Sequence, residues 1–501
     1  MDILIAYDKF CQIMRTLRMS QQRLSTGIPG LDEVLMGGLI AGRAYLVRGA
    51  PGCGKTTLGM HFLNAGKLQN EITLLITLGE LEAQLRLNSS FLGLDLDQIA
   101  VLDLSPSSEF FTQVQSYDIF SPAEVERAPI TQKIIEQVET LKPQRIFIDS
   151  ITQFRYLATD KFQFHKQVLS FLRFLKERGI TTVLSTEASR EAPDEDLQFI
   201  ADGIINLEFH HGERSLSVQK FRSSDFRVGN HSIRMTSQGI KVFPRLIPEQ
   251  FDGHFQHESI PSGIPELDEL LQGGLERGTI TIFTGPSGVG KTTLGMQFMK
   301  EAAGRGERSL VCCFEEAPET LLRRCESVNI PVRAMMERGT LSVIPIEPLL
   351  YTPDEFANLV RREVEEQGTQ IVMIDSIAGY RLSFREQELV NHLHAIGRYL
   401  KNMGVATLLI NETETITGEF RITELGISYL ADNIIFLRYL EIQGELHKAI
   451  GVLKKRLSDF EKTLREIEIT RYGIKVGKPL TNLRGILTGT PDFINPSDRQ
   501  R

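Results

Sequence analysis

The sequence predicts an α/β protein of two tandem domains, each with a mostly parallel sheet flanked by helices. Three observations support this fold class. A module with a glycine-rich loop occurs twice in the 501 residues, and its loop lysines, Lys55 and Lys291, are 291 − 55 = 236 positions apart. Within each module, strand-like segments alternate with helix-like segments, as in a parallel sheet covered on both faces. The composition, 41% hydrophobic and 24% charged, is typical of a globular protein with large cores.

The repeat divides the chain into parts. The residues before it have no counterpart, so they form either a short capping helix or a segment upstream of a true start at Met19. Two prolines and a glycine between Phe243 and Ser259 are typical of a linker. The predicted parts are an N-terminal extension (1–18), a first domain (19–245), a linker (246–258), a second domain (259–491) and a short C-terminal tail (492–501).

The elements of the first module follow in order. An apolar segment at 44–48 has the pattern of a strand that runs into the glycine-rich loop. After the loop, Leu58, Phe62 and Ala65 recur at helical spacing and predict a helix over 57–65. Further strands are predicted at 71–78, 145–149 and 181–185, and a further helix at 168–178. Because ligands of such sheets bind at the carboxyl ends of the strands, we expect the site there.

Charge and composition exclude several classes of protein. A net charge of −8 argues against a general electrostatic grip on DNA or RNA, so no nucleic-acid partner is expected. The first residues lack the pattern of a secretory signal, and no apolar run approaches the roughly 20 residues of a membrane-spanning helix. The five cysteines show no zinc spacing and no paired framework. We therefore expect a cytoplasmic protein with reduced thiols and no membrane partner.

The glycine-rich loops are GAPGCGKT at 49–56 and GPSGVGKT at 285–292. In such a loop the backbone N–H groups converge on phosphates and the lysine reaches the terminal phosphates, so each module is predicted to bind ATP. The predicted ATP-binding residues are Gly49, Gly52, Cys53, Gly54, Lys55, Thr56 and Thr57 in the first loop, and Gly285, Ser287, Gly288, Val289, Gly290, Lys291, Thr292 and Thr293 in the second. Cys53 is expected to be a reduced thiol like the others; the alternative is a regulatory role, in which oxidation of Cys53 blocks nucleotide binding to the first loop.

A magnesium site is predicted beside each loop. The threonine hydroxyl of such a loop holds Mg²⁺, and Asp149 and Asp375 each end an apolar strand on the same side of the sheet. We therefore predict that Thr56 pairs with Asp149 at one metal site, and Thr292 with Asp375 at the other. The alternative is that each aspartate only begins a surface loop after a core strand.

Further carboxylates differ between the modules. In the second, a strand at 310–314 ends in Glu315-Glu316, and two acids there can position a water or accept a hydroxyl proton near the γ-phosphate. In the first, Gly79-Glu80 follows the corresponding strand, so one acid is missing. The predicted catalytic residues are Glu315, Glu316 and Glu80, and hydrolysis by the first module is in question.

A basic pair recurs near the end of each module, as Lys220 and Arg222 in the first and Lys454 and Arg456 in the second. Residues two apart on a strand share a face. Because each pair is far in sequence from its own loop, we predict that it reaches the γ-phosphate of a neighbouring subunit, as activating basic fingers do. The alternative is a solvated basic edge.

Together these residues resemble the KaiC family, double-domain ATPases related to RecA. The resemblance runs from about Ser25 to Pro491. It rests on the lead-ins STGIPGLD and PSGIPELD, the following Gly-Gly-Leu, both loops, the Asp-Ser strand ends, Glu315-Glu316, and the segment from Asp432 to Ile450 that contains YLEIQGE. It implies two RecA-like domains that stack as a two-tier homohexamer, with ATP between subunits, ATPase activity in the first ring and autophosphorylation in the second.

The resemblance also assigns roles. Glu315 falls on the family's catalytic base. The family's Ser-Thr acceptor pair falls on Ser428 and Tyr429, so Ser428 is kept and a tyrosine stands where threonine is usual; the nearby Thr423 also matches. Both Ser428 and Tyr429 are therefore predicted phosphorylation sites.

Partners and competing functions follow from the same comparison. We expect self-association and a KaiB-like or signalling partner. We do not expect KaiA binding, because the chain ends ten residues after Pro491, where the family's clock protein carries a longer tail. The resulting expectation is an ATPase and autokinase that acts as a timing or signalling switch. The competing hypotheses are a DNA-dependent RecA-like ATPase, which the acidic charge disfavours, and a nucleotide-gated scaffold with little hydrolysis in the first ring, which Gly79 suggests.

Overall fold

The computed structural model describes eleven stretches of the chain: 22–105, 122–157, 161–187, 194–210, 212–256, 258–347, 350–382, 386–413, 427–481, 483–485 and 492–493. The predicted extension at 1–18, most of the predicted tail and the candidate acceptor Thr423 lie outside these residues.

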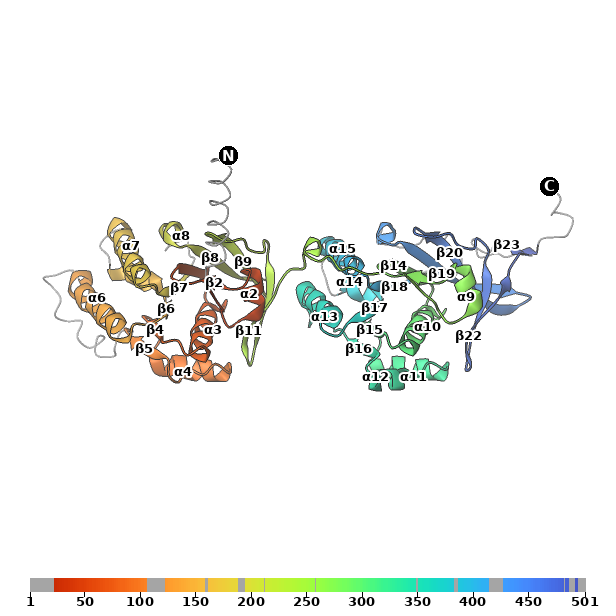
Figure 1. Cartoon of the computed structure of the whole chain (residues 1–501), viewed down its shortest axis with the longest axis horizontal. Coiled ribbons are helices and arrows are strands. Elements are labelled where there is room, and N and C mark those ends of the chain that lie inside the picture. The colour runs from red at the N-terminus through yellow and green to blue at the C-terminus, as the bar shows by residue number, and fades with distance from the viewer. Residues whose placement is uncertain are drawn as a thin grey trace, which may run out of the picture. The chain divides into compact units, whose positions relative to one another are not determined.

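The chain divides into two compact units, Met1–Arg245 and Leu246–Arg501. Each unit contains one nine-stranded, mostly parallel sheet with helices on both faces, which confirms the predicted fold class (Figure 1). The two sheets have the same topology: in each, a parallel portion carries the glycine-rich loop, and an antiparallel portion formed by the last strands of the unit extends one side.

The first sheet has the strand order β11-β10-β9-β8-β3-β7-β6-β4-β5. Its parallel strands are β3 (Ala44–Gly49), β4 (Thr73–Thr77), β5 (Ala100–Asp103), β6 (Arg145–Asp149), β7 (Thr181–Glu187) and β8 (Gly203–His210). Its antiparallel strands are β9 (Glu213–Phe221), β10 (His231–Thr236) and β11 (Gly239–Phe243). The short strands β1 (Arg23–Leu24) and β2 (Leu39–Ile40) pair separately.

Helices cover this sheet because its strands alternate between two apolar faces. On β6, Phe147 joins one core and its neighbours Ile146 and Ile148 join the other. Residues of α3 contribute to the first core and residues of α6 and α7 to the second. The helices of the unit are α2 (Pro29–Val34), α3 (Lys55–Leu68), α4 (Glu82–Phe91), α6 (Pro122–Leu141), the 3₁₀ helix η1 (Ile151–Leu157), α7 (Lys161–Glu177) and α8 (Glu195–Ile200).

The second sheet has the order β16-β15-β17-β18-β14-β19-β20-β21-β22. Its strands are β14 (Ile280–Gly285), β15 (Arg308–Cys313), β16 (Leu341–Pro345), β17 (Thr369–Asp375), β18 (Ala406–Glu412), β19 (Asn433–Ile442), β20 (Glu445–Lys455), β21 (Arg465–Thr470) and β22 (Gly473–Pro479). Short separate pairs are β12 (Ser259–Ile260) with β13 (Leu275–Glu276), and β23 (Leu483–Arg484) with β24 (Asp492–Phe493).

The helices of the second unit repeat the plan of the first. The helix after the second loop, α10, and the helix α11 contribute residues to the core on one face of the sheet. The helices α13 and α15 contribute residues to the core on the other face. The helices are α9 (Pro265–Leu270), α10 (Lys291–Gly304), α11 (Pro318–Ser327), α12 (Val332–Glu337), α13 (Pro353–Glu365), α14 (Ile377–Leu382), α15 (Glu386–Asn402), and the 3₁₀ helices η2 (Pro248–Gln250) and η3 (Ile427–Tyr429).

The segment predicted as a linker packs on the second unit. The Phe251 and Tyr399 rings meet edge to face with centroids 4.9 Å apart. The side-chain amide of Asn402 donates to the carbonyl oxygens of Pro248 and Phe251, at 3.0 and 3.1 Å. Residues 246–251 therefore form part of the second unit through contacts with α15.

Candidate nucleotide sites

Each glycine-rich loop connects the central strand of a unit to the helix that follows, β3 to α3 and β14 to α10. The residue before each helix, Gly54 or Gly290, has a left-handed backbone, with φ of 110° and 114°. A Cβ on Gly290 would lie 2.2 Å from Cδ1 of Ile469. The left-handed φ therefore favours glycine at both positions, and the turn directs the N–H groups of the helix start toward the loop, where an anion can bind.

The loop lysines occupy equivalent positions. Lys55 Nζ donates to the carbonyl oxygens of Gly49 and Ala50, at 2.9 and 3.0 Å. Lys291 Nζ donates to the corresponding oxygens of the second loop, both at 2.8 Å. Burial lowers the pKa of Lys291, while nearby carboxylates, including Asp375 and Glu315, favour its charged form. Both ammonium groups therefore lie within a phosphate loop whose backbone holds them in place.

The predicted metal pairs are in contact. Thr56 Oγ1 donates to Asp149 Oδ2 at 2.6 Å, and Thr292 Oγ1 donates to Asp375 Oδ2 at 2.8 Å. Burial raises the pKa of Asp375, although the bond from Thr292 opposes this. Each pair offers one hydroxyl and one carboxylate oxygen, the hard ligands that Mg²⁺ takes alongside phosphates and water. The residues present thus fit Mg²⁺, and no cluster of three acidic, histidine or cysteine side chains suited to a metal occurs among the described residues.

A pocket of about 630 Å³ opens beside the second loop, and Lys291, Thr292, Glu315, Glu316 and Asp375 all line it. Ser376 Oγ donates a short hydrogen bond to Glu315 Oε1. Glu316 forms an ion pair with Arg324 at 2.8 Å. The structure thus brings the predicted loop, metal and catalytic residues of the second unit into one cavity, and it holds the two glutamates by different partners.

The first unit has a reduced set of acids. Glu80 follows β4 as Glu316 follows β15, and Gly79 stands where the second unit has Glu315. Burial and the nearby charge of Asp149 raise the pKa of Glu80. At the position of Arg324 the first unit has Asn88, which cannot form the ion pair that holds Glu316. The Cys53 side chain lies in the core, and burial raises the pKa of its thiol, which disfavours the reactive thiolate.

The family model described as "ATPase: KaiC" matches the chain twice, over residues 24–247 and 260–481, so each match contains one phosphate loop with its Thr–Asp pair. The chain belongs to the KaiC ATPase family.

Full-length relatives agree with the KaiC assignment. The chain is 28% identical over 497 residues to the circadian clock oscillator protein KaiC of Parasynechococcus marenigrum, covering 96% of this chain and 95% of that protein. It is 29% identical over 495 residues to the KaiC of Prochlorococcus marinus strain SARG, covering 96% and 97%. It is 28% identical over 495 residues to the circadian clock protein KaiC3 of a Synechocystis strain, covering 96% of each.

In this KaiC-family chain, the basic pairs lie away from their own loops. Lys220 is paired with Ile204 near the start of β8, whereas the loop follows Gly49, which is paired with Leu207. Lys220 Nζ donates to the carbonyl oxygen of Gln198 at 2.8 Å. In the second unit, Lys454 Nζ donates to the carbonyl oxygen of Ala431 at 2.7 Å. Neither pair therefore reaches the loop of its own unit along these strands.

Sequence reasoning missed a second cation at each loop. Arg214 Nη2 donates to the carbonyl oxygen of Gly52 at 3.4 Å, and Lys448 Nζ donates to that of Gly288 at 3.2 Å. The Arg214 guanidinium lies 4.5 Å from the Phe209 ring centroid, and Lys448 Nζ lies 5.6 Å from that of Tyr439. The signal in the sequence was an aromatic residue and a cation that face each other across a hairpin, Phe209 with Arg214 and Tyr439 with Lys448.

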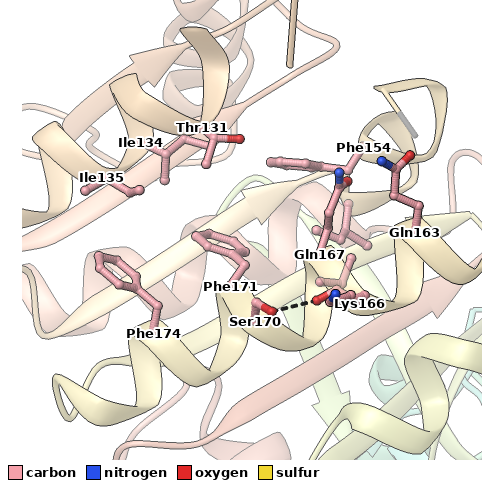
Figure 2. Close-up of a pocket in the computed structure, with 12 residues that line it drawn as sticks. Thr131, Ile134, Ile135, Phe154, Gln163, Lys166, Gln167, Ser170, Phe171 and Phe174 are labelled. Atoms are coloured by element: carbon pink, nitrogen blue, oxygen red, sulfur yellow. Dashed lines mark hydrogen bonds between the residues drawn. The ribbon is translucent and has the colours of Figure 1, made fainter. Parts of the chain in front are cut away.

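A second cavity, of about 540 Å³, lies in the first unit between α6, η1 and α7 (Figure 2). Phe171 and Phe174 of α7 and Ile134 of α6 line it. Residues of these helices join the core opposite the one to which α3 contributes, and the described lining residues include no phosphate-loop residue and no carboxylate. We therefore assign the cavity no role in nucleotide chemistry. None of the described helices is both long enough and apolar enough to cross a lipid bilayer.

Proposed function

We propose that this KaiC-family ATPase is also a serine autokinase that works as a double-ring homohexamer and serves as a timing or signalling switch. The observation that carries the proposal is the second pocket, where Glu315, fixed by Ser376, shares one cavity with Lys291 and the Thr292–Asp375 pair. A carboxylate near the γ-phosphate can accept the proton of an attacking hydroxyl. The loop lysine, the Thr292–Asp375 pair and Glu315 thus supply the phosphate-binding, metal-side and base groups that a phosphoryl transfer site requires.

The residues that would hold Mg²⁺ are Thr56 with Asp149 and Thr292 with Asp375, and the ion when bound offsets phosphate charge during transfer. Lys291 binds the terminal phosphates and Lys448 adds a second positive charge beside the same loop. Asp375 and Thr292 orient each other through their hydrogen bond.

We propose Ser428 as the acceptor, in the site of a neighbouring subunit. Ser428 lies in η3, directly before β19, and so at the end of the sheet opposite its own loop. In the transfer, the Ser428 oxygen forms a bond to the γ-phosphorus and the bond from that phosphorus to the β,γ-bridging oxygen breaks. ADP leaves with the bridging oxygen, and the hydroxyl proton goes to the Glu315 carboxylate.

The same placement supports assembly as a closed ring. The basic pairs and Ser428 lie at one end of each sheet and the phosphate loops at the other. A head-to-tail contact between copies brings the two ends together, and such contacts close into rings when the rotation allows. The ring of six follows the family resemblance. Lys220, Arg222, Lys454 and Arg456 would then act on the neighbour's nucleotide.

A phosphate on Ser428 explains how the ring would act as a switch. It adds about −1.5 to −2 charges at pH 7. Lys454 Nζ already lies 3.3 Å from the Ser428 carbonyl oxygen, and Arg456 lies beside it. The new charge would redirect these cations and thereby change the packing between subunits or the docking of a KaiB-like or signalling partner.

A second role is proposed for the first unit, as a ring that binds ATP for assembly and hydrolyses it slowly. Gly79 removes the acid that Ser376 orients in the second unit, and Glu80 has no ion-pair partner among the described residues. The loop, Lys55 and the Thr56–Asp149 pair are intact.

The test is to incubate the purified chain with Mg²⁺ and γ-labelled ATP and to map the label. Label on Ser428 that disappears in Ser428→Ala and in Glu315→Gln supports the autokinase. ATP hydrolysis with no covalent label overturns it and leaves the ATPase. Turnover that persists in Lys291→Ala would contradict the slow first ring.

A further inference from the structure

Each unit presents an exposed aromatic ring at the same point of the repeat. Phe199 in α8 is 76% exposed, and Tyr429 in η3 is 53% exposed. In both units an aspartate, Asp202 or Asp432, lies three positions after the aromatic residue. The first strand of the long hairpin, β8 or β19, begins at the next residue. Figure 1 shows α8 beside β8 and β9, the hairpin that follows it. Single exposed rings occur elsewhere on this chain, so the observation that matters is the recurrence of a ring at the same point of both units.

The backbone of each ring-bearing residue is fixed by the basic pair of its own unit. Arg222 Nη2 donates to the Phe199 carbonyl oxygen at 3.2 Å, and Arg456 Nη2 donates to the Tyr429 carbonyl oxygen at 3.1 Å. The lysine of each pair donates to the residue before the ring, Gln198 or Ser428. The ring and the two cations therefore lie next to one another in each unit.

A buried aspartate ties that surface to the central strand. Asp202 accepts from the Ala44 N–H at 3.3 Å, and Asp432 accepts from the Ile280 N–H at 3.1 Å. Their side chains are 7% and 2% exposed. Each also pairs with a lysine and with the arginine of the basic pair. A surface held in this way is pre-organised, so that a partner loses little conformational entropy when it binds.

Both units have an aromatic side chain at this position, but only the second unit has hydroxyl groups there. Phe199 has no hydroxyl, and its neighbour Gln198 replaces Ser428. What the repeat preserves at this position is therefore an aromatic contact surface beside two cations. Ser428 is the residue that adds phosphorylation chemistry to it in the second unit only.

We infer that Phe199 and Tyr429 are anchors that pack against a neighbouring copy of this chain, and that Tyr429 acts through its ring and is not a phosphate acceptor. This inference rests on the proposed self-assembly. The occupant follows from charge, because the surface carries a lysine and an arginine in each unit. The opposite end of the second unit offers Glu315, Glu316 and Glu412 around a site for phosphates, and that of the first unit offers Glu80 near Asp149. A different partner would have to carry two such acidic sites to match both units.

The test compares ring assembly of the full chain with Phe199→Ala, Tyr429→Ala and Tyr429→Phe variants, in ATP and Mg²⁺, by sedimentation velocity over a range of concentrations. We expect each alanine variant to assemble at least about 30-fold more weakly, the effect of losing an aromatic hot spot. Tyr429→Phe should assemble like the wild type and keep its label from γ-labelled ATP. The matched control is Phe162→Ala, because Phe162 is 78% exposed and Gln387 stands at the corresponding position of α15.

The outcomes separate the two proposals. A wild-type chain that stays monomeric overturns self-assembly and this inference with it. If the wild-type chain assembles and the alanine variants assemble equally well, only the anchor role is overturned. Loss of label in Tyr429→Phe together with full label in Ser428→Ala shows that the tyrosine hydroxyl is the acceptor, and overturns the second part.

Discussion

The hydroxyl of Ser376 donates a hydrogen bond to the carboxylate of Glu315 at the edge of the second nucleotide pocket. Ser376 itself follows Asp375, which accepts from the loop threonine Thr292. The serine and aspartate are consecutive in the chain, so one strand end positions both the metal-side carboxylate and the proposed base. Glu315 and Asp375 are therefore linked through consecutive residues of one strand end.

Replacing the proposed base tests this arrangement. Glu315→Gln keeps the size of the side chain and its contact with Ser376, but an amide cannot accept the acceptor's proton. We expect phosphate incorporation to fall by about 10²–10⁴-fold, the usual contribution of a general base. Affinity for a non-hydrolysable ATP analogue, measured by calorimetry, should change little, because Lys291 and the loop remain. Equal loss of binding and incorporation would indicate a structural role.

The first unit offers the reverse experiment. Among the described residues, the one atom within 4 Å of a Cβ placed on Gly79 would be Gln153 Nε2, at 4.0 Å, so a side chain can begin there without a clash. We expect Gly79→Glu in a Lys291→Ala background to raise ATP turnover at least about tenfold, a modest part of what a general base contributes. The measurement is phosphate release from ATP by the Lys291→Ala variant and by the Gly79→Glu, Lys291→Ala double variant. Unchanged turnover would mean that Glu80 alone already serves the first site, or that the first site does not hydrolyse ATP for another reason.

The role of the second phosphate loop can be tested by substituting two glycines, Gly290 directly before α10 and Gly304 at its end. Gly290→Ala places a methyl 2.2 Å from Ile469 at φ of 114°, so the loop must distort. We expect loss of nucleotide-induced stabilisation of the second unit in thermal unfolding. In the part of the chain that the structure describes, the methyl of Gly304→Ala, at the end of the same helix, meets nothing within 4 Å. This variant should be neutral or stabilising by up to about 1 kcal/mol. Similar behaviour of the two variants would contradict the role of Gly290.

The fold and the loops could be predicted because their signals are local. A glycine spacing and an apolar strand that ends in aspartate specify the loop and Asp149 without any distant contact. Arg214 and Lys448 could not be found in the same way, because each reaches its loop from a hairpin far along the chain. The packing of Phe251 on Tyr399 was missed because proline and glycine in a segment predict its turns and not what it packs against.

The last prediction concerns the pH dependence of the first unit. His61 is buried in α3, and its Nε2 accepts a hydrogen bond from the Ile240 N–H at 2.9 Å, so the ring is neutral. Burial lowers its pKa to about 4. The unfolded chain, with an ordinary histidine pKa of about 6.5, binds the extra proton first. Stability is therefore full above pH 6.5 and falls by about 3 kcal/mol as the pH drops through the window to about 4.

The second unit supplies the matched substitution for this test. Gln297 occupies the position of His61 in α10 and is also buried, and its amide donates to the Ser262 carbonyl oxygen at 2.8 Å. Since an amide does not titrate, His61→Gln should remove the acid-dependent loss from the first unit's transition in urea unfolding between pH 4 and pH 7. The transition of the second unit should not change between the two proteins. A first unit that loses as much stability with glutamine as with histidine would show that other groups cause its acid sensitivity.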